Sequence, residues 1–357
     1  MMRTYIIAEA GVNHNGSLEL AKKMVREAAA AGADAIKFQT FQAEKLVSKH
    51  AAKADYQKET TGRNESQLDM IRKLELSEED HSQIILECER AGITFLSTPF
   101  DTSSLRLLTY TYNMQTLKIS SGDITNLPLL YEAGKSGADI ILSTGICTLG
   151  DIEEALGALA YAYTVADDIP SANSFRHAYF SDEGQAVLKR KVTLLHCTTD
   201  YPTAYTDVHL NKMLTLKQAF GLKTGYSDHT LGTEIPVAAV TLGAAVIEKH
   251  FTLDQSMEGP DHKASMEPEE LTAMIRQIRN VEQALGIAVK IPVSSELGNA
   301  KAARKSVVAA VEIKKGELLT EANLTIKRPG NGLAPSAFWE LLGKISDRDY
   351  LPDDLIV

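Results

Sequence analysis

Short apolar runs alternate with longer amphipathic stretches through the first 290 residues, and this alternation constrains the fold more than any other feature of the sequence. The rhythm is typical of βαβ units, because two parallel strands need a connection about as long as a helix. The strands that we expect are Tyr5–Ala10, Ala35–Gln39, Thr94–Ser97, Leu117–Ser120, Ile140–Ser143, Val192–His196, Lys223–Ser227 and Val246–Phe251. Eight strand and helix pairs in about 250 residues predict a (β/α)8 TIM barrel, since an open doubly wound sheet usually stops at five or six strands.

The pattern changes after Gly286, which predicts a second, smaller domain. We expect the barrel over residues 1–286, a linker over 287–299 and a small β-rich domain over 300–357. Two insertions interrupt the barrel pattern. Residues 41–73 follow the carboxyl end of a strand, where barrel active-site loops lie, and are a candidate substrate lid, whereas residues 167–191 follow a helix and are expected to be structural.

The composition excludes several classes of function. The chain of 357 residues has 37 Lys and Arg against 47 Asp and Glu, a net charge of -10 that gives no basis for nucleic-acid or anionic-membrane binding. No apolar run approaches the roughly 20 residues of a membrane span, and the three cysteines lack a CxxC spacing, which is typical of a reducing, cytoplasmic setting. An anionic substrate must therefore be bound by a few cations placed in a cleft.

Two lysines provide candidates for those cations. Lys37 and Lys118 lie inside apolar strands, and because burying an unpaired charge is costly, we expect both to face the barrel mouth. With serines at neighbouring strand ends they would bind a phosphate or a carboxylate. The alternative is that each lysine pairs with a barrel carboxylate, Glu9 or Glu248, and only fills the interior.

Two histidines and two carboxylates stand at the same end of the strands. His229 and His250 end adjacent strands, where neutral imidazoles suit a divalent transition metal, although a histidine there is also often a hydrogen-bonded structural residue. Glu9 and Asp123 are the carboxylates best placed to move a proton, with helix capping or salt bridging as the alternative. The residues alone leave both questions open.

The motifs at these strand ends resemble those of the sialic acid synthase family, in the same order along nearly the whole chain. They are residues 8–17, 36–40, 96–100, 117–122, 142–145, 195–203, 225–230, 247–252 and 259–262. Residues 303–306 and 327–332 resemble the antifreeze-like (SAF, β-clip) C-terminal domain of that family. The resemblance implies condensation of phosphoenolpyruvate with an N-acyl hexosamine such as N-acetylmannosamine, giving N-acetylneuraminate and phosphate.

The resemblance also implies roles for particular residues. His229 and His250 would bind a divalent metal, typically Mn²⁺, with Mg²⁺ or Co²⁺ as alternatives. Phosphoenolpyruvate would be held by Lys37, Thr98, Lys118, Ser121, Ser143, Thr199 and Ser227. Glu9 and Asp123 would act as catalytic carboxylates, and the sugar would be contacted by Gln39, Tyr201, Asp261 and Arg328. Arg328 would reach the sugar from a partner subunit, which implies a homodimer with exchanged C-terminal domains.

Two departures from the family pattern bear on the identity of the sugar. Asp123 stands where some members have Glu, and Thr199 where some have Asn. A synthase of N,N'-diacetyllegionaminate, acting on 2,4-diacetamido-2,4,6-trideoxymannose, is therefore an alternative. Two further alternatives are a class I aldolase in which Lys37 or Lys118 forms a Schiff base, and an inactive barrel whose C-terminal domain binds a glycan.

Overall fold

The computed structural model describes residues 3–53, 66–165 and 169–357, and in these residues the first unit of the chain is the expected barrel. Its strands are β1 Tyr5–Gly11, β2 Ala35–Thr40, β3 Thr94–Pro99, β4 Thr116–Ile119, β5 Asp139–Ser143, β6 Val192–His196, β7 Lys223–Asp228 and β8 Val246–His250. All ladders between them are parallel, in the order β3-β2-β1-β8-β7-β6-β5-β4. Strands β3 and β4 lie against each other, so the sheet is nearly closed.

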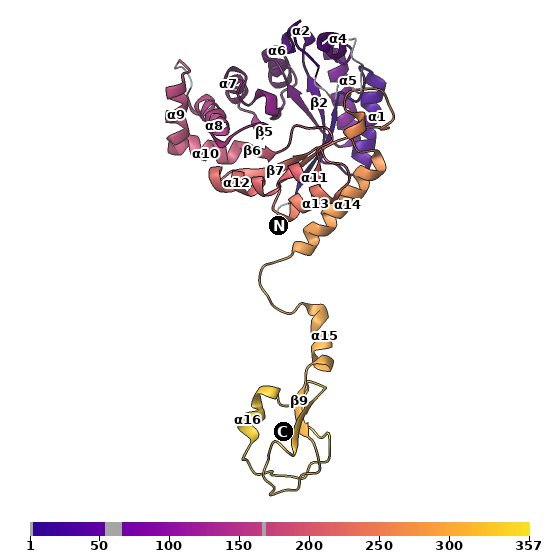
Figure 1. Ribbon diagram of the computed structural model, residues 1–357, viewed down its shortest axis with the longest axis vertical. Helices are drawn as coiled ribbons and strands as arrows, with labels where there is room; N and C mark the ends of the chain where they lie inside the picture. The colour runs from indigo at the N-terminus through magenta and orange to yellow at the C-terminus, as the bar shows by residue number, and fades with distance from the viewer. Residues whose placement is uncertain (1–2, 54–65, 166–168) are drawn as a thin grey trace. The chain divides into compact units, whose positions relative to one another are not determined.

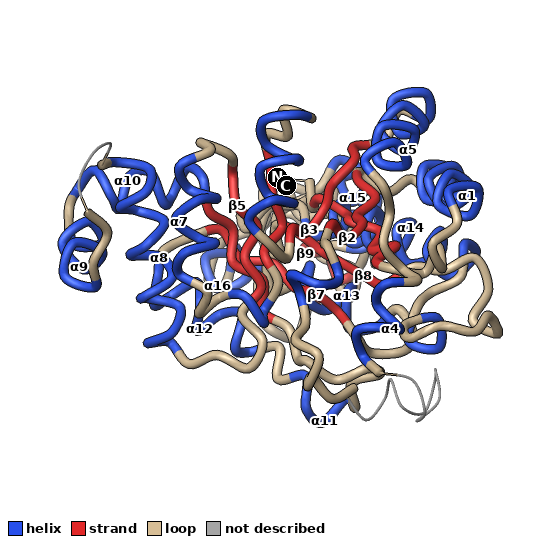
Figure 2. The backbone as a smooth tube through the Cα atoms, turned by 90° about the horizontal axis from the view of Figure 1, so that it is seen from above, coloured by secondary structure: helices blue, strands red, loops and turns tan. Residues whose placement is uncertain are grey.

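Helices follow the strands and cover the outside of the sheet (Figure 1). The helices of this unit are α1 Leu18–Ala30, α2 Ala43–Leu46, α4 Gln67–Arg72, α5 Glu78–Ala91, α6 Thr102–Arg106, α7 Leu127–Lys135, α8 Leu149–Thr164, α9 Ala172–Phe180, α10 Asp182–Lys191, α11 Tyr205–Val208, α12 Asn211–Phe220, α13 Glu234–Thr241 and α14 Pro268–Leu285. From above, α1, α5 and α14 lie on one side of the strands and α7, α8 and α12 on the other (Figure 2).

Helix α5 illustrates how local sequence sets the bounds of these elements. Ser77 caps its first turn by accepting a hydrogen bond from the backbone of Asp80, whose carboxylate accepts one from the backbone of Ser77 in return. Gly92 ends the helix with a φ of 69°, a left-handed conformation that glycine adopts at little cost. The residues at both ends of α5 thus set its bounds.

The barrel interior has an apolar layer at the amino-terminal end of the strands. It consists of Ile7, Ala35, Leu96, Ile141, Leu195 and Val246, one residue from each of six strands. Outward-facing residues of the same strands, among them Ile6, Ile36 and Ile247, pack against the surrounding helices. Because side chains alternate between the two faces of a strand, the residue two positions beyond each interior residue also faces the barrel axis, nearer the mouth.

The two insertions differ in what they contribute. Residues 41–53 and 66–73 lie after β2 and include α2 and α4, whereas the remainder of the expected lid, residues 54–65, lies outside the described residues. In the second insertion, residues 167–168 also lie outside them. The rest forms α9 and α10, and Phe175 of α9 is buried in the core beside α8, as expected of a structural segment.

Residues 287–357 form a second compact unit. Strands β9 Ser306–Ala309 and β10 Leu324–Lys327 pair in antiparallel fashion over a small core that includes Val307, Ile313 and Tyr350, and α16 spans Phe338–Leu341. Helix α15, Ser294–Ala303, occupies the second half of the segment expected to be a linker. The helix runs four residues past Asn299, the expected end of the linker.

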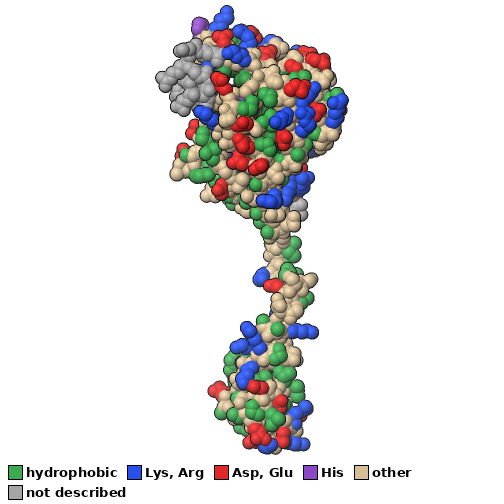
Figure 3. Space-filling model, turned by 90° about the vertical axis from the view of Figure 1, so that its right-hand side faces the viewer, with side chains coloured by type: hydrophobic (Ala, Val, Ile, Leu, Met, Phe, Trp, Pro, Cys, Tyr) green, Lys and Arg blue, Asp and Glu red, His purple; other side chains and the backbone are tan. Residues whose placement is uncertain are grey.

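The outer surface of the first unit carries charges of both signs. On the face shown in Figure 3, acidic and basic side chains are interspersed. Within the described part of the chain, no helix combines the length and the apolar character needed to cross a membrane. The feature that sets this unit apart is therefore the interior of its barrel.

Candidate active site

A polar layer lies above the apolar layer, at the carboxyl ends of the strands. Strand alternation places there Glu9 two residues after Ile7, Lys37 two after Ala35, Thr98 two after Leu96, Ser143 two after Ile141 and Glu248 two after Val246. All five side chains are buried, as are Lys118 of β4 and Ser227 of β7. The same alternation that fills the bottom of the barrel with hydrocarbon thus fills the top with charge.

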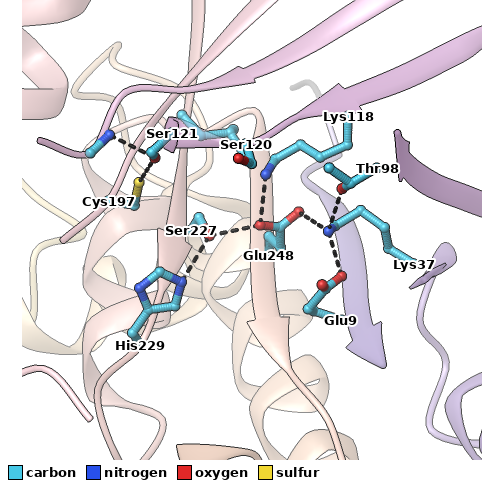
Figure 4. A network of polar contacts seen from close by, with 12 residues as sticks. Glu9, Lys37, Thr98, Lys118, Ser120, Ser121, Cys197, Ser227, His229 and Glu248 are labelled. Carbon is cyan, nitrogen blue, oxygen red and sulfur yellow. Dashed lines mark hydrogen bonds and ion pairs between the residues drawn. The ribbon is translucent and has the colours of Figure 1, made fainter. Parts of the chain in front are cut away.

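Two lysines and two glutamates in this layer form one network (Figure 4). The Lys37 ammonium lies 2.6 Å from Oε2 of Glu9 and 3.7 Å from Oε2 of Glu248, and donates a hydrogen bond of 3.0 Å to Thr98. Lys118 lies 3.2 Å from Oε1 of Glu248, which also accepts a hydrogen bond of 2.7 Å from Ser227. Glu248 is therefore the carboxylate shared by both lysines, and we name these four residues the inner ionic network.

The two glutamates differ in their affinity for a proton. Burial raises the pKa of Glu9 from 4.5 to about 7, and the repulsion of Glu248 acts against the attraction of Lys37. Burial alone would also raise the pKa of Glu248, but Lys118, Lys37 and the Ser227 hydroxyl lower it well below its usual range. With Glu248 ionised and Glu9 protonated, two lysines face one negative charge, and the network carries a net positive charge that suits an anion.

The two predicted metal-binding histidines are neighbours at the mouth. Their ring centroids lie 5.4 Å apart, and the ring of Tyr201 packs 4.2 Å from that of His229 and 5.4 Å from that of His250. Nδ1 of His229 donates a 2.5 Å hydrogen bond to the carbonyl of Thr198, which leaves the lone pair of Nε2 toward Ser227. Burial lowers the pKa of both histidines, so both are neutral at pH 7.

These two histidines fit a divalent metal. Nδ1 of His250 is buried and has no hydrogen-bond partner among the described residues, and neutral imidazole is a good ligand for such ions. The described residues contain no cluster of three or more His, Cys, Asp or Glu side chains that could hold an ion by themselves. A metal bound here would take its remaining ligands from water or substrate.

A second group of polar atoms converges at the end of β1. A side chain at Gly11 would place its Cβ 3.3 Å from Oε1 of Glu9, 3.4 Å from Nε2 of Gln39 and 3.8 Å from Oδ2 of Asp261. The glycine, whose φ is 51°, leaves this space open. Burial raises the pKa of Asp261 to about 6. An amide and two carboxyl groups around one opening are suited to binding hydroxyl groups.

The inner ionic network, the histidines and the group at Gly11 line one cavity of about 510 Å³. The sequence-predicted residues that line it are Glu9, Lys37, Gln39, Thr98, Lys118, Ser121, Ser143, Thr199, Tyr201, Ser227, His229, His250 and Asp261. Ser121 lies at the side of the cavity, where its Oγ accepts a hydrogen bond from the Gly145 backbone and lies 3.1 Å from Sγ of Cys197. The first unit therefore brings thirteen of the fifteen predicted site residues together.

Asp123 and Arg328 are not part of this lining. The carboxylate of Asp123 accepts hydrogen bonds from Ser120 and from Asn126 at the start of α7. Burial raises the pKa of Asp123, although these two hydrogen bonds act to lower it. Asp123 does not itself cap α7, whose cap is Asn126, but it contacts the side chain of that cap. Arg328 belongs to the second unit, where its Nε donates to the carbonyl of Ala303, and its predicted role stays a prediction.

Two groups of lining residues were absent from the set predicted to carry the chemistry. Glu248 was expected only as a possible lysine partner, although its position in the alternation of β8 marks it as inward-facing. The second group is apolar and comes largely from the insertion after β2, where no periodic pattern points to a cavity.

Another buried ionic group lies on the opposite face of β8. Lys249 contacts Oδ2 of Asp228 and the carbonyl of Thr230, and Oδ1 of Asp228 accepts hydrogen bonds of 3.1 and 2.9 Å from the backbone and hydroxyl of Thr230. We name Lys249, Asp228 and Thr230 the outer ionic group. It lies outside the cavity lining, and it fixes the residues on both sides of His229.

Comparisons with known proteins agree with this arrangement. A profile of the NeuB family matches residues 24–290, and a profile of the SAF domain matches residues 304–357. The N,N'-diacetyllegionaminic acid synthase of Campylobacter jejuni is 49% identical over 100% of this chain and 99% of its own, and that of Legionella pneumophila is 43% identical over 96% and 90%. A solved N-acetylneuraminic acid synthetase from Leptospira borgpetersenii, in complex with citrate, aligns with a TM-score of 0.67 and 32% identity over 83% of this chain and 90% of that one.

Proposed function

This chain belongs to the NeuB family, and we propose that it condenses phosphoenolpyruvate with 2,4-diacetamido-2,4,6-trideoxymannose and water to give N,N'-diacetyllegionaminate and phosphate. The observation that carries the proposal is the identity of 49% with a diacetyllegionaminic acid synthase over the whole chain. It favours the alternative weighed from the sequence over the expectation of N-acetylmannosamine. The reaction class is the same for both sugars.

The inner ionic network supports binding of phosphoenolpyruvate. Lys37 and Lys118 are held at the mouth by Glu248, and with Glu9 protonated they present a net positive charge to an incoming anion. Hydroxyl groups at the ends of β3, β5 and β7 and in the adjoining loops add hydrogen bonds to phosphate or carboxylate oxygens. The binding residues that we propose are Lys37, Thr98, Lys118, Ser121, Ser143, Thr199 and Ser227.

The proposed reaction joins C3 of phosphoenolpyruvate to C1 of the open-chain sugar. The electron pair of the enol double bond forms the new bond, the aldehyde oxygen takes up a proton, and positive charge develops at C2 of the former enol. Water adds at C2 and gives up one proton. The C–O bond to phosphate then breaks, and the remaining hydroxyl proton at C2 passes to the departing phosphate, which leaves the ketone. Lys37 and Lys118 stabilise the departing phosphate, and ionised Glu248 offsets positive charge at C2.

Glu9 is the proposed proton carrier of this sequence. Its pKa of about 7 allows it to hold or release a proton near neutral pH, whereas Asp123 is hydrogen-bonded to Ser120 and Asn126 and lies outside the cavity lining. Gln39, Tyr201 and Asp261 are the proposed sugar contacts. A divalent metal at His229 and His250, Mn²⁺ or alternatively Mg²⁺ or Co²⁺, would act as a Lewis acid on a carbonyl oxygen.

A Schiff-base aldolase is less compatible with the network. Burial alone would lower the pKa of Lys37, but Glu248 and Glu9 raise it above its usual value, which disfavours the neutral amine that a Schiff base requires. Borohydride trapping separates the two mechanisms. We expect borohydride with pyruvate to leave the protein unmodified and active.

A phosphate-release assay with Mn²⁺ and both sugars tests the proposal. We expect rapid release with the diacetamido sugar, slower release with N-acetylmannosamine, and loss of activity in EDTA that Mn²⁺ restores. If neither sugar led to phosphate release, the result would contradict the proposal and favour the inactive, glycan-binding barrel. Activity that resists EDTA would contradict the metal.

We also propose the homodimer in which Arg328 of one subunit reaches the sugar site of the other. It is supported by apolar side chains at alternate positions of residues 287–293, Ile287, Val289, Ile291 and Val293, all of which are exposed in the single chain. Arg328→Ala is expected to raise the KM for the sugar more than the KM for phosphoenolpyruvate. An unchanged KM for the sugar would contradict the assignment.

A further inference from the structure

Part of the lining of the cavity is apolar. Six apolar residues that line it form a cluster of their own, separate from the barrel core: Val12, Phe41, Leu46, Ile71, Leu74 and Phe100. We name this cluster the apolar wall. The Phe41 and Phe100 rings pack edge to face with their centroids 6.4 Å apart. The wall is therefore a packed surface, and three of its six residues come from the described parts of the insertion after β2.

The wall offers few hydrogen-bonding groups. Within the described residues of 41–74, Gln67 is the one polar side chain that lines the cavity. Its amide can donate and accept, as an acetamide does. Among the described residues of this segment, a ligand group placed against the wall thus meets hydrocarbon and one amide.

The two ends of the sugar have different chemistry. Its aldehyde end must meet phosphoenolpyruvate beside Lys37, Lys118 and the histidines, so C4 to C6 extend away from the inner ionic network. In N-acetylmannosamine this far end carries hydroxyl groups at C4 and C6, whereas in 2,4-diacetamido-2,4,6-trideoxymannose it carries an acetamido group and a methyl group. The two sugars therefore differ at the end that leaves the polar side of the cavity.

We propose that the apolar wall binds C4 to C6 of the sugar and selects 6-deoxy, 4-acetamido hexosamines over hexosamines with free hydroxyls there; this inference rests on the proposed function. Burial of a methyl group against hydrocarbon is favourable, whereas burial of a hydroxyl group without a partner is unfavourable. Both effects act in the same direction at C6. At C4, the acetamide adds a methyl group for the wall and polar atoms for Gln67.

A series of three sugars tests the proposal on the unaltered protein. The sugars are N-acetylmannosamine, its 6-deoxy derivative and the 2,4-diacetamido-2,4,6-trideoxy sugar, each assayed for phosphate release at saturating phosphoenolpyruvate. We expect kcat/KM to rise about tenfold at each step, a factor that corresponds to about 1.4 kcal/mol. Equal values for the three sugars would overturn the inference but leave the proposed reaction intact. A preference for N-acetylmannosamine would overturn the inference and the proposed sugar, and would leave only the reaction class. Release with none of them would refute the proposed function and the inference with it.

A matched pair of variants on α4 tests the wall itself. Ile71 lines the cavity, whereas Leu68, also half-buried on the same helix, does not. Ile71→Gln is expected to lower the preference for the diacetamido sugar over N-acetylmannosamine at least tenfold, with the KM for phosphoenolpyruvate unchanged, and Leu68→Gln is expected to leave that preference as it is. An unchanged preference in Ile71→Gln, or an equal loss in both variants, would overturn the inference. The sugar series decides the matter if either variant fails to fold.

Discussion

The inner ionic network and the outer ionic group meet opposite faces of strand β8, through Glu248 and Lys249 respectively, yet only the charges of the inner network face a cavity. In the outer group, Lys249 and Asp228 are satisfied by each other and by Thr230. In the inner network, Lys37 and Lys118 share Glu248 and line a cavity. The comparison shows that burial of charge does not by itself mark a candidate site, since both groups are buried and, of the two, the inner network alone faces a cavity.

Lys118→Met should have the largest effect, and on activity. The variant removes one of the two proposed cations for phosphate, so we expect kcat/KM for phosphoenolpyruvate to fall 10³- to 10⁴-fold, roughly 4–6 kcal/mol. Glu248 keeps Lys37 and Ser227 as partners, so thermal unfolding should change little. A variant that retains more than a tenth of the activity would contradict the proposed role of the inner ionic network in binding phosphoenolpyruvate.

Lys249→Met is the matched change in the outer ionic group. It leaves Asp228 buried without its cation, and we expect the free energy of unfolding to fall by about 3–5 kcal/mol. Thermal denaturation of Lys249→Met and of the double variant Lys249→Met/Asp228→Asn measures the effect. The double variant should regain part of the loss, since its buried side chain is neutral. Unchanged stability in Lys249→Met would contradict the structural role of the outer group.

Glu9→Gln tests the inner ionic network through the pH dependence of stability. The pKa of Glu9 is about 7 in the folded protein against 4.5 ordinarily, so the unfolded chain releases this proton first as pH rises. The contribution of Glu9 to the free energy of unfolding is therefore fully present below pH 4.5. It decreases as pH rises and is lost by pH 7, which lowers the free energy of unfolding by up to roughly 3 kcal/mol.

The variant stays neutral throughout, so relative to the wild type it should gain stability between pH 5 and pH 8. The lowered pKa of Glu248 acts in both proteins and largely cancels in this difference. Unfolding midpoints of both proteins measured at pH 5 and pH 8 test this expectation. A variant whose stability relative to the wild type decreases as pH rises would contradict it.

The sequence predicted the barrel and most of the polar site for one physical reason. Strand alternation with period two places Lys37, Lys118 and His250 at the mouth once the strands are recognised, and each strand bound lies within two residues of its expected place. The same alternation places Glu248 at the mouth. A carboxylate that pairs with Lys37 or Lys118 can also simply fill the barrel interior, and the sequence alone did not separate this structural role from a role in the site.

The remaining site residues depend on irregular segments. Asp123 lies in a single turn, Ser121–Asp123, which brings its carboxylate to Asn126, outside the cavity lining. The apolar wall is built from loop residues and the short helices α2 and α4, whose path no periodic pattern fixes. Loop geometry depends on long-range packing, so these parts of the site were found only in the folded chain.

The fate of the bridging oxygen of phosphoenolpyruvate tests the central claim most directly. With phosphoenolpyruvate labelled by ¹⁸O at the C–O–P bridge, Mn²⁺ and the diacetamido sugar, the account predicts that the label appears in the released phosphate, because the C–O bond breaks after water adds at C2. Mass spectrometry of the phosphate measures it. Unlabelled phosphate, formed by cleavage of the P–O bond, would contradict the account.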